Sequence, residues 1–130
     1  MRSDLQAFAE RYTAAWCSQE PRQVAAHFAE NGWLKVNAGA PAVGRAAVEE
    51  IARSFMTAFP DLTVSLDRLV ERDGAVEYHW TLTGANTGPG GTGRRVRISG
   101  YEAWTLGAGG LIAESRGWFD EAEYQRQLAG

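Results

Sequence analysis

Ionisable side chains recur at every second position in two segments that are typical of β-strands. These segments are AVEYHWTLT, residues 75–83, and LIAESRGWF, residues 111–119. Side chains two residues apart in a strand point to the same face of the sheet. In each segment one face therefore gathers polar, ionisable or aromatic groups, namely Glu77, His79, Thr81 and Thr83 in the first and Glu114, Arg116 and Trp118 in the second.

This alternation fits two interpretations. If helices cover the polar face and enclose a cavity, the Glu, His and Arg side chains lose solvent. Their pKa values can then shift into the range that acid–base catalysis needs. If the face stays open to water, the pattern is that of an ordinary antiparallel sheet with one solvated side.

Other familiar kinds of site have little support in this chain. The segment TGPGGTG, residues 87–93, is rich in glycine. A phosphate-binding loop leads into a helix, whereas a strand is expected here. His27 and His79 lack the spacing of zinc ligands. Cys17 stands beside Trp16 and suits a packed thiol. We therefore expect no metal and no organic cofactor.

The composition indicates one folded domain, residues 1–130, with 45% hydrophobic and 22% charged residues. A net charge of -3 argues against nucleic-acid binding. The first residues, MRSDLQAFAE, lack the apolar core of a signal peptide. No segment approaches the ~20 apolar residues of a membrane span. The single cysteine cannot form an intrachain disulfide. We expect a cytoplasmic protein that binds neither nucleic acid nor membrane.

Apolar residues at helical spacing predict three helices before residue 60. The first spans about Asp4–Cys17, the second residues 21–30 and the third residues 44–59. A short strand, WLKVNAG at residues 33–39, lies between the second and third helices. Pro60 ends the third helix.

After Pro60 the apolar period changes from that of a helix to that of a strand. The first strand begins at Leu62, and Asp73-Gly74 supplies a two-residue hairpin turn after it. The remaining strands are predicted at residues 75–84, 94–106 and 111–119, and Asp120 opens a final helix. Helices followed by hairpin-linked strands indicate an α+β fold with helices on one face of an antiparallel sheet.

Several strings resemble the nuclear-transport-factor-2-like superfamily, the cone-shaped α+β fold of ketosteroid isomerase, limonene epoxide hydrolase and the SnoaL-like polyketide cyclases. ERYTAAW and VAAHFAENG are similar to the opening helices, VGRAAVEEIARSF to the start of the third helix, and GAGGLIAESRGWFD to the last hairpin. The resemblance covers nearly the whole chain and implies N-terminal helices packed on a curved sheet. It implies no single activity, because this fold hosts isomerases, cyclases, hydrolases, dehydratases and non-catalytic binders.

The resemblance transfers only part of the known catalytic sets. Tyr12 matches the helix-1 tyrosine that supports the isomerases' oxyanion hole, although a Tyr simply packed on the helix's apolar stripe would look the same. The other positions hold different residue types: Val36 or Asn37 for the isomerases' base, Tyr101 or Glu102 for their second aspartate, and Glu102 with Arg116 or Gly117 for the cyclases' His and Asp.

The isomerase register also predicts which face of the sheet lines the cavity. It puts the apolar face outside, where such a face would support a homodimer. A shift of one residue would exchange the two faces and turn Glu102 inward. In the first register the cavity side carries His79, Tyr101, Glu114, Arg116 and Trp118, and the outside carries Tyr78, Trp80, Ile98 and Trp104.

From these patterns we expect a SnoaL-like pocket protein that performs cofactor-free proton transfer on a small apolar metabolite with a carbonyl or hydroxyl group. The expected reactions are isomerisation, cyclisation or hydration. His79 is the expected general base, because imidazole titrates near neutrality. Tyr12 or Tyr101 would donate to an oxyanion, and Arg116 would hold its charge. Asp120 is the nearest acid, although its spacing favours a helix cap. The expected ligand contacts are Trp16, Trp33, Asn37, Phe55, Phe59, Glu114 and Trp118.

Two other functions remain open on the sequence. A non-catalytic binder of a hydrophobic ligand, or a dimeric interaction module, fits the incomplete catalytic pairs. Epoxide hydrolysis needs an Asp-Arg-Asp arrangement, of which only Arg116 and Asp120 are present. An enclosed pocket with His79 and Arg116 near one ligand atom would favour an enzyme. A pocket filled by the five Trp would favour a structural role.

Overall fold

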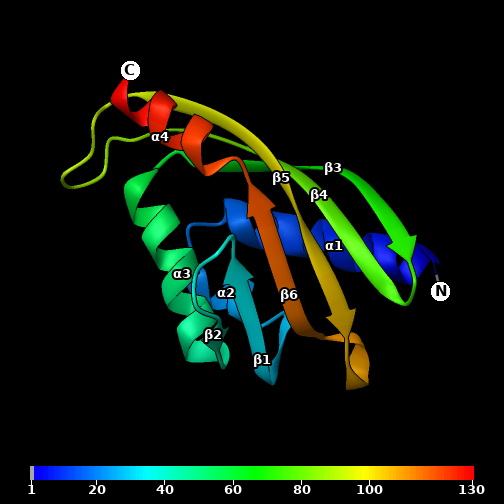
Figure 1. The fold of residues 1–130 in the computed structure, drawn as a ribbon. Helices are drawn as coiled ribbons and strands as arrows, with labels where there is room; N and C mark the ends of the chain where they lie inside the picture. The colour runs from blue at the N-terminus through cyan, green and yellow to red at the C-terminus, as the bar shows by residue number, and fades with distance from the viewer. Residues whose placement is uncertain (1) are drawn as a thin grey trace.

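A six-stranded sheet forms the frame of the molecule (Figure 1). The structure is a computed structural model that describes residues 2–130. The strands are β1 (Phe28–Val36), β2 (Ala42–Val43), β3 (Thr63–Arg72), β4 (Ala75–Ala85), β5 (Arg95–Leu106) and β6 (Ile112–Phe119). Their order in the sheet is β2-β1-β6-β5-β4-β3. Neighbours pair antiparallel except β1 and β6, which run parallel.

The helices gather on one side of this curved sheet and at one of its ends. They are α1 (Arg2–Cys17), α2 (Pro21–Ala25), α3 (Arg45–Ala58) and α4 (Glu121–Ala129), with a 3₁₀ turn, η1 (Ala108–Gly110), in the last hairpin. Figure 1 shows α1 crossing behind the long strands, α3 near β1 and β2, and α4 at one end of the sheet. This arrangement confirms the predicted α+β class. No helix among the described residues is long and apolar enough to cross a membrane.

The predicted hairpin at residues 73–74 joins β3 to β4. Asp73 and Gly74 have φ values of 50° and 79°, so both lie in the left-handed region that a tight two-residue hairpin requires. Glycine adopts this conformation without a steric penalty, and aspartate tolerates it better than most residues. The turn aligns Leu82 with Val64 and Arg72 with Ala75 across the two strands.

Two elements differ from their predicted bounds. The second helix ends at Ala25 instead of residue 30, and β1 already begins at Phe28. Val24 and Phe28 are four residues apart and both fully buried, so a short helix followed by a strand gives the same apolar spacing as one longer helix. The two-residue β2, which pairs with Trp33 and Leu34, was not predicted, because so short a strand leaves no period to detect.

The predicted assignment of the two sheet faces is wrong. Tyr78, Ile98 and Trp104 are at most 5% exposed and belong to the core. The apolar stripes of the helices need an apolar partner, and the hydrophobic effect therefore selects this face of the sheet. The polar face with His79 and Arg116 points away from that core. The register shifted by one residue, with Glu102 inward, is the one observed.

Candidate functional site

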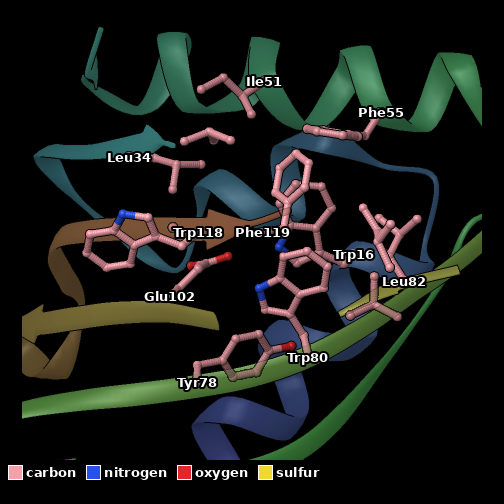
Figure 2. Close-up of a pocket in the computed structure, with 14 residues that line it drawn as sticks. Trp16, Leu34, Ile51, Phe55, Tyr78, Trp80, Leu82, Glu102, Trp118 and Phe119 are labelled. Carbon is pink, nitrogen blue, oxygen red and sulfur yellow. The ribbon is translucent and has the colours of Figure 1, made fainter. Parts of the chain in front are cut away.

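A mostly apolar pocket lies between the inner face of the sheet and the helices α1 and α3 (Figure 2). The space between its lining residues is about 580 Å³, which includes the part that is open to solvent. Its wall includes aromatic side chains from α1, α3, β4 and the end of β6, among them Trp16, Phe55, Tyr78, Trp80, Trp118 and Phe119.

One carboxyl group, that of Glu102 on β5, reaches this apolar pocket (Figure 2). The Glu102 side chain is fixed by three donors that converge on its Oε1 atom. The Tyr12 hydroxyl donates over 3.0 Å, and Trp104 Nε1 and Ser115 Oγ each donate over 2.9 Å. Oε2 has only a longer contact of 3.2 Å, to the Tyr12 hydroxyl. The arrangement therefore orients the carboxyl and leaves Oε2 as its less occupied oxygen.

Local structure explains how these groups come together. Glu102 and Trp104 are two residues apart on β5 and so share the inner face. Ser115 on β6 lies directly opposite Trp104 in the antiparallel register. Tyr12 comes from α1, and its ring packs on Trp104 with centroids 5.3 Å apart. A helix and two neighbouring strands thus form the support of a single carboxyl.

Burial changes the acid–base properties of this group. Loss of solvent raises the pKa of Glu102 above its ordinary value, although the hydrogen bonds from Trp104, Ser115 and Tyr12 oppose the shift. Burial, together with the neighbouring Glu102 carboxyl, also holds the pKa of Tyr12 well above that of a free tyrosine. The phenol therefore keeps its proton and acts as a donor to Glu102. Such a carboxyl can accept or release a proton nearer neutral pH.

A second polar group in the pocket wall, the indole nitrogen of Trp80, has no hydrogen-bond partner. Among the buried nitrogen and oxygen atoms of the described side chains, Trp80 Nε1 is the one without a partner. The polar atoms of Tyr78 and Trp104 are satisfied, because the Tyr78 hydroxyl bonds Thr13 Oγ1 at 2.6 Å and Trp104 donates to Glu102. Buried donors without partners are rare.

Three of the predicted catalytic residues lie on the outer face of the sheet. His79 bonds Glu77 at 3.1 Å and stacks on Tyr101, with ring centroids 5.2 Å apart. Arg116 lies over the ring of Trp33, 4.9 Å from its centroid. None of the three lines the pocket. The prediction that they face the cavity is therefore wrong, because the apolar face of the sheet, and not the polar one, packs against the helices.

The remaining predicted residues divide between the pocket and other positions. Trp16, Phe55 and Trp118 line the pocket, and Trp118 also contacts Tyr101 at the outer face. Tyr12 supports the pocket carboxyl from behind. The other predicted residues do not line the pocket. Trp33 and Glu114 lie beside Arg116, and Phe59 is fully buried in the core. Asn37 accepts a hydrogen bond from Phe119 N, and Asp120 caps α4 by accepting one from Glu123 N.

Comparison with known proteins shows which family this chain belongs to. The model of the SnoaL-like polyketide cyclases matches residues 6–128. The chain belongs to this family. The resemblance predicted from the sequence is thereby confirmed over almost the whole chain. No curated protein matches the sequence.

Solved structures share the SnoaL-like fold of this chain. TsrD from Streptomyces laurentii has a TM-score of 0.83 at 22% identity, covering 98% of this chain and 96% of that chain. A putative SnoaL-like polyketide cyclase from Jannaschia sp. CCS1 has a TM-score of 0.81 at 18% identity, covering 95% and 90%. A hypothetical protein with a ketosteroid isomerase-like protein fold from Catenulispora acidiphila DSM 44928, in complex with trimethylamine, has a TM-score of 0.81 at 15% identity, covering 94% and 92%. At these identities the likeness concerns the fold.

Neither Glu102 nor Trp80 was predicted as a site residue of this SnoaL-like chain. Glu102 was matched to the isomerases' second aspartate or the cyclases' His and faced inward only in the shifted register, and Trp80 was expected outside. A signal was present: on its face of β5, Glu102 is a charged residue among the apolar Ile98, Trp104 and Leu106. A carboxyl on an otherwise apolar strand face indicates a buried, partnered group more strongly than the alternating charges of the outer face do.

Proposed function

We propose that this SnoaL-like protein catalyses proton transfer on a small, mostly apolar metabolite that contains a carbonyl or hydroxyl group, without a metal or organic cofactor. The observation that supports this function is the carboxyl of Glu102, an oriented acid–base group with a raised pKa in an apolar pocket. Active sites are where burial and specific partners combine to shift pKa values.

The chemistry follows from the hydrogen bonds of Glu102. In its ionised form Oε2 removes a proton from the carbon next to a carbonyl group, and the electron pair of that C–H bond moves into an enolate. The donors to Oε1 keep the carboxylate oriented. Return of the proton to another carbon gives isomerisation. Attack of the enolate carbon on a second carbonyl, whose oxygen takes up the proton from Glu102, gives cyclisation. A pKa raised toward the working pH makes this base stronger.

Deuterium exchange tests the proposal. Small ketones such as acetophenone, incubated with the protein in D₂O, should exchange their α-hydrogens, which NMR follows as loss of the α-proton signal. Glu102→Gln keeps the shape and removes the base, so the rate should fall about 10²- to 10⁴-fold. Glu77→Gln, on the outer face of β4, is the matched control and should keep the rate, as should His79→Gln. Equal rates in wild type and Glu102→Gln would refute the role of Glu102.

A non-catalytic binder is the second candidate function. It is favoured by the position of His79 and Arg116 outside the pocket, which leaves Glu102 with little ionisable support. The trimethylamine complex of the similar Catenulispora acidiphila protein supports the idea that such a fold can hold a small organic molecule without a stated reaction. Tight ketone binding without any α-hydrogen exchange would favour this function over catalysis.

Self-association through the outer sheet face also belongs to the proposal. The apolar face on which the dimer was predicted lies inside, so the original reason no longer holds. The outer face instead carries an aromatic row in which His79 stacks on Tyr101 and Tyr101 contacts Trp118. Trp118 is 40% exposed, which is unusual for a large apolar side chain and supports a homodimer at this surface.

A further inference from the structure

The indole N–H of Trp80 is a buried donor in the wall of the pocket with no acceptor among the described side chains and backbone. Removing an N–H group from water without a compensating hydrogen bond costs free energy. Trp104, a neighbour on the same sheet face, shows the usual solution, since its Nε1 donates to Glu102. Trp80 Nε1 is itself closed to solvent, so a ligand atom can supply the missing acceptor once a side chain of the pocket wall moves aside.

The position of the Trp80 ring is built into the sheet. Trp80 lies directly opposite Gly100 on β5, and a Cβ atom at position 100 would come within 2.8 Å of Trp80 Cζ2. The Trp80 ring also meets Phe119, with centroids 6.1 Å apart and an interplanar angle of 64°. The missing side chain at residue 100 thus provides the space that the indole occupies. The Trp80 ring is therefore held in place by its neighbours.

Trp80 and Glu102 lie within reach of one small molecule. Glu102 is opposite Tyr78, and Trp80 is two residues further along β4, so the two are diagonal neighbours on the same face. Diagonal neighbours on adjacent strands are roughly 7–8 Å apart. Figure 2 shows both side chains projecting into the same pocket. A ligand between them can contact both the donor and the carboxyl.

We propose that Trp80 binds the oxygen of the ligand and thereby selects carbonyl compounds. This inference rests on the proposed function, in which Glu102 exchanges a proton with the carbon beside that carbonyl. The indole N–H donates to the carbonyl oxygen and, when the proton is removed, to the enolate oxygen on which negative charge develops. Donors aimed at a developing oxyanion stabilise the transition state. An alkylammonium ion offers no acceptor to this donor.

Indole resonances of the wild-type protein report this hydrogen bond directly. The five Trp give indole ¹H–¹⁵N signals that can be assigned on the wild-type chain. Titration with acetophenone should move the Trp80 N–H proton downfield. α-Methylstyrene has the same shape with CH₂ in place of oxygen, and it should leave the Trp80 signal without this shift. A Trp80 signal that responds equally to both probes would overturn the inference.

Two Trp→Phe variants separate the effect of the Trp80 donor from that of a Trp outside the pocket. The preference for acetophenone over α-methylstyrene, as a ratio of dissociation constants, should be about 5- to 10-fold in wild type. Trp80→Phe should bring the ratio near one. Trp33→Phe, on the outer face, should keep it. An unchanged ratio in Trp80→Phe contradicts the assignment.

The same probes distinguish failure of the inference from failure of the proposed function. If the preference for acetophenone requires Trp80 while no α-hydrogen exchange requires Glu102, the result supports Trp80 as the oxygen anchor, the donor that binds the ligand oxygen, and refutes the catalysis. Exchange that requires Glu102 without any preference for acetophenone at Trp80 refutes the oxygen anchor alone. If neither probe binds to the wild-type protein, both the anchor and the carbonyl substrate class are wrong.

Discussion

Glu102 has a structural environment that bears on the chemical role proposed for it. A buried carboxyl without partners would be strongly unfavourable, and the donors Tyr12, Trp104 and Ser115 reduce that cost. They do not remove it, because the pKa of Glu102 is still raised. A buried carboxyl of this kind lowers the stability of the fold. Such destabilising residues are typical of functional sites, where activity requires a shifted pKa.

This raised pKa predicts a specific dependence of stability on pH. The folded state holds the Glu102 proton more tightly than the unfolded chain, whose carboxyl titrates near pH 4.5. Below that pH both states are protonated and nothing is lost. Above it the free energy of unfolding falls by about 1.4 kcal/mol per pH unit until the folded-state pKa is passed, and is then constant.

Urea unfolding of wild type and Glu102→Gln from pH 4 to pH 9 measures this effect. The amide introduced by this substitution does not titrate, and the other groups cancel in the difference between the two proteins. The wild type should therefore lose stability relative to Glu102→Gln as the pH rises above about 4.5. A difference that stays flat with pH, or that grows in favour of the wild type, would show that the pKa of Glu102 is not raised.

Among the structural elements, β5 and β6 depend on two glycines with different roles. A Cβ atom at Gly100 would lie 2.2 Å from the Trp118 carbonyl oxygen and 3.0 Å from Phe119 Cβ, in addition to meeting the Trp80 ring. A Cβ atom at Gly117 would meet nothing closer than 3.5 Å, with Glu102 Cγ at 3.6 Å. The first position allows no side chain without movement of the strand, whereas the second allows a methyl group.

Gly100→Ala should therefore destabilise the protein by about 1–3 kcal/mol, the usual cost of overpacking a well-packed region. Gly117→Ala, the matched control on the next strand, should change the free energy of unfolding by less than about 1 kcal/mol. Urea denaturation measures both. Similar stabilities for the two variants would mean that β5 and β6 separate more easily than their packing indicates.

The same strands show what the sequence could and could not predict. The residue pattern identified the α+β order, the turn at Asp73-Gly74 and the cap at Asp120, because each depends on local periodicity or turn chemistry. It did not determine which face of β4 meets the helices, since a one-residue change in register inverts every side chain. His79 and Arg116 were therefore expected in the pocket, and Trp80 outside it. Only the packing of α1 and α3 against the strands decides between these faces.

At the scale of the whole molecule, the helices and the sheet divide the side chains into an enclosed interior and an outer sheet face. The interior supplies the pocket with Glu102 and Trp80. The outer face carries the aromatic row that ends at Trp118, together with Arg116 over Trp33. A surface that combines exposed aromatic and arginine side chains has the composition of a protein–protein interface.

If this surface forms a homodimer, sedimentation velocity should detect a dimer at micromolar concentrations. Replacing Trp118 with Ser removes the most exposed aromatic side chain of the row, and the dimer should weaken at least tenfold, because aromatic anchors contribute most of the binding energy in such contacts. Val43→Ser is the control, since Val43 is 64% exposed but lies on β2 at the edge of the sheet. A monomeric wild type, or equal dissociation constants in all three proteins, would exclude this face as the interface.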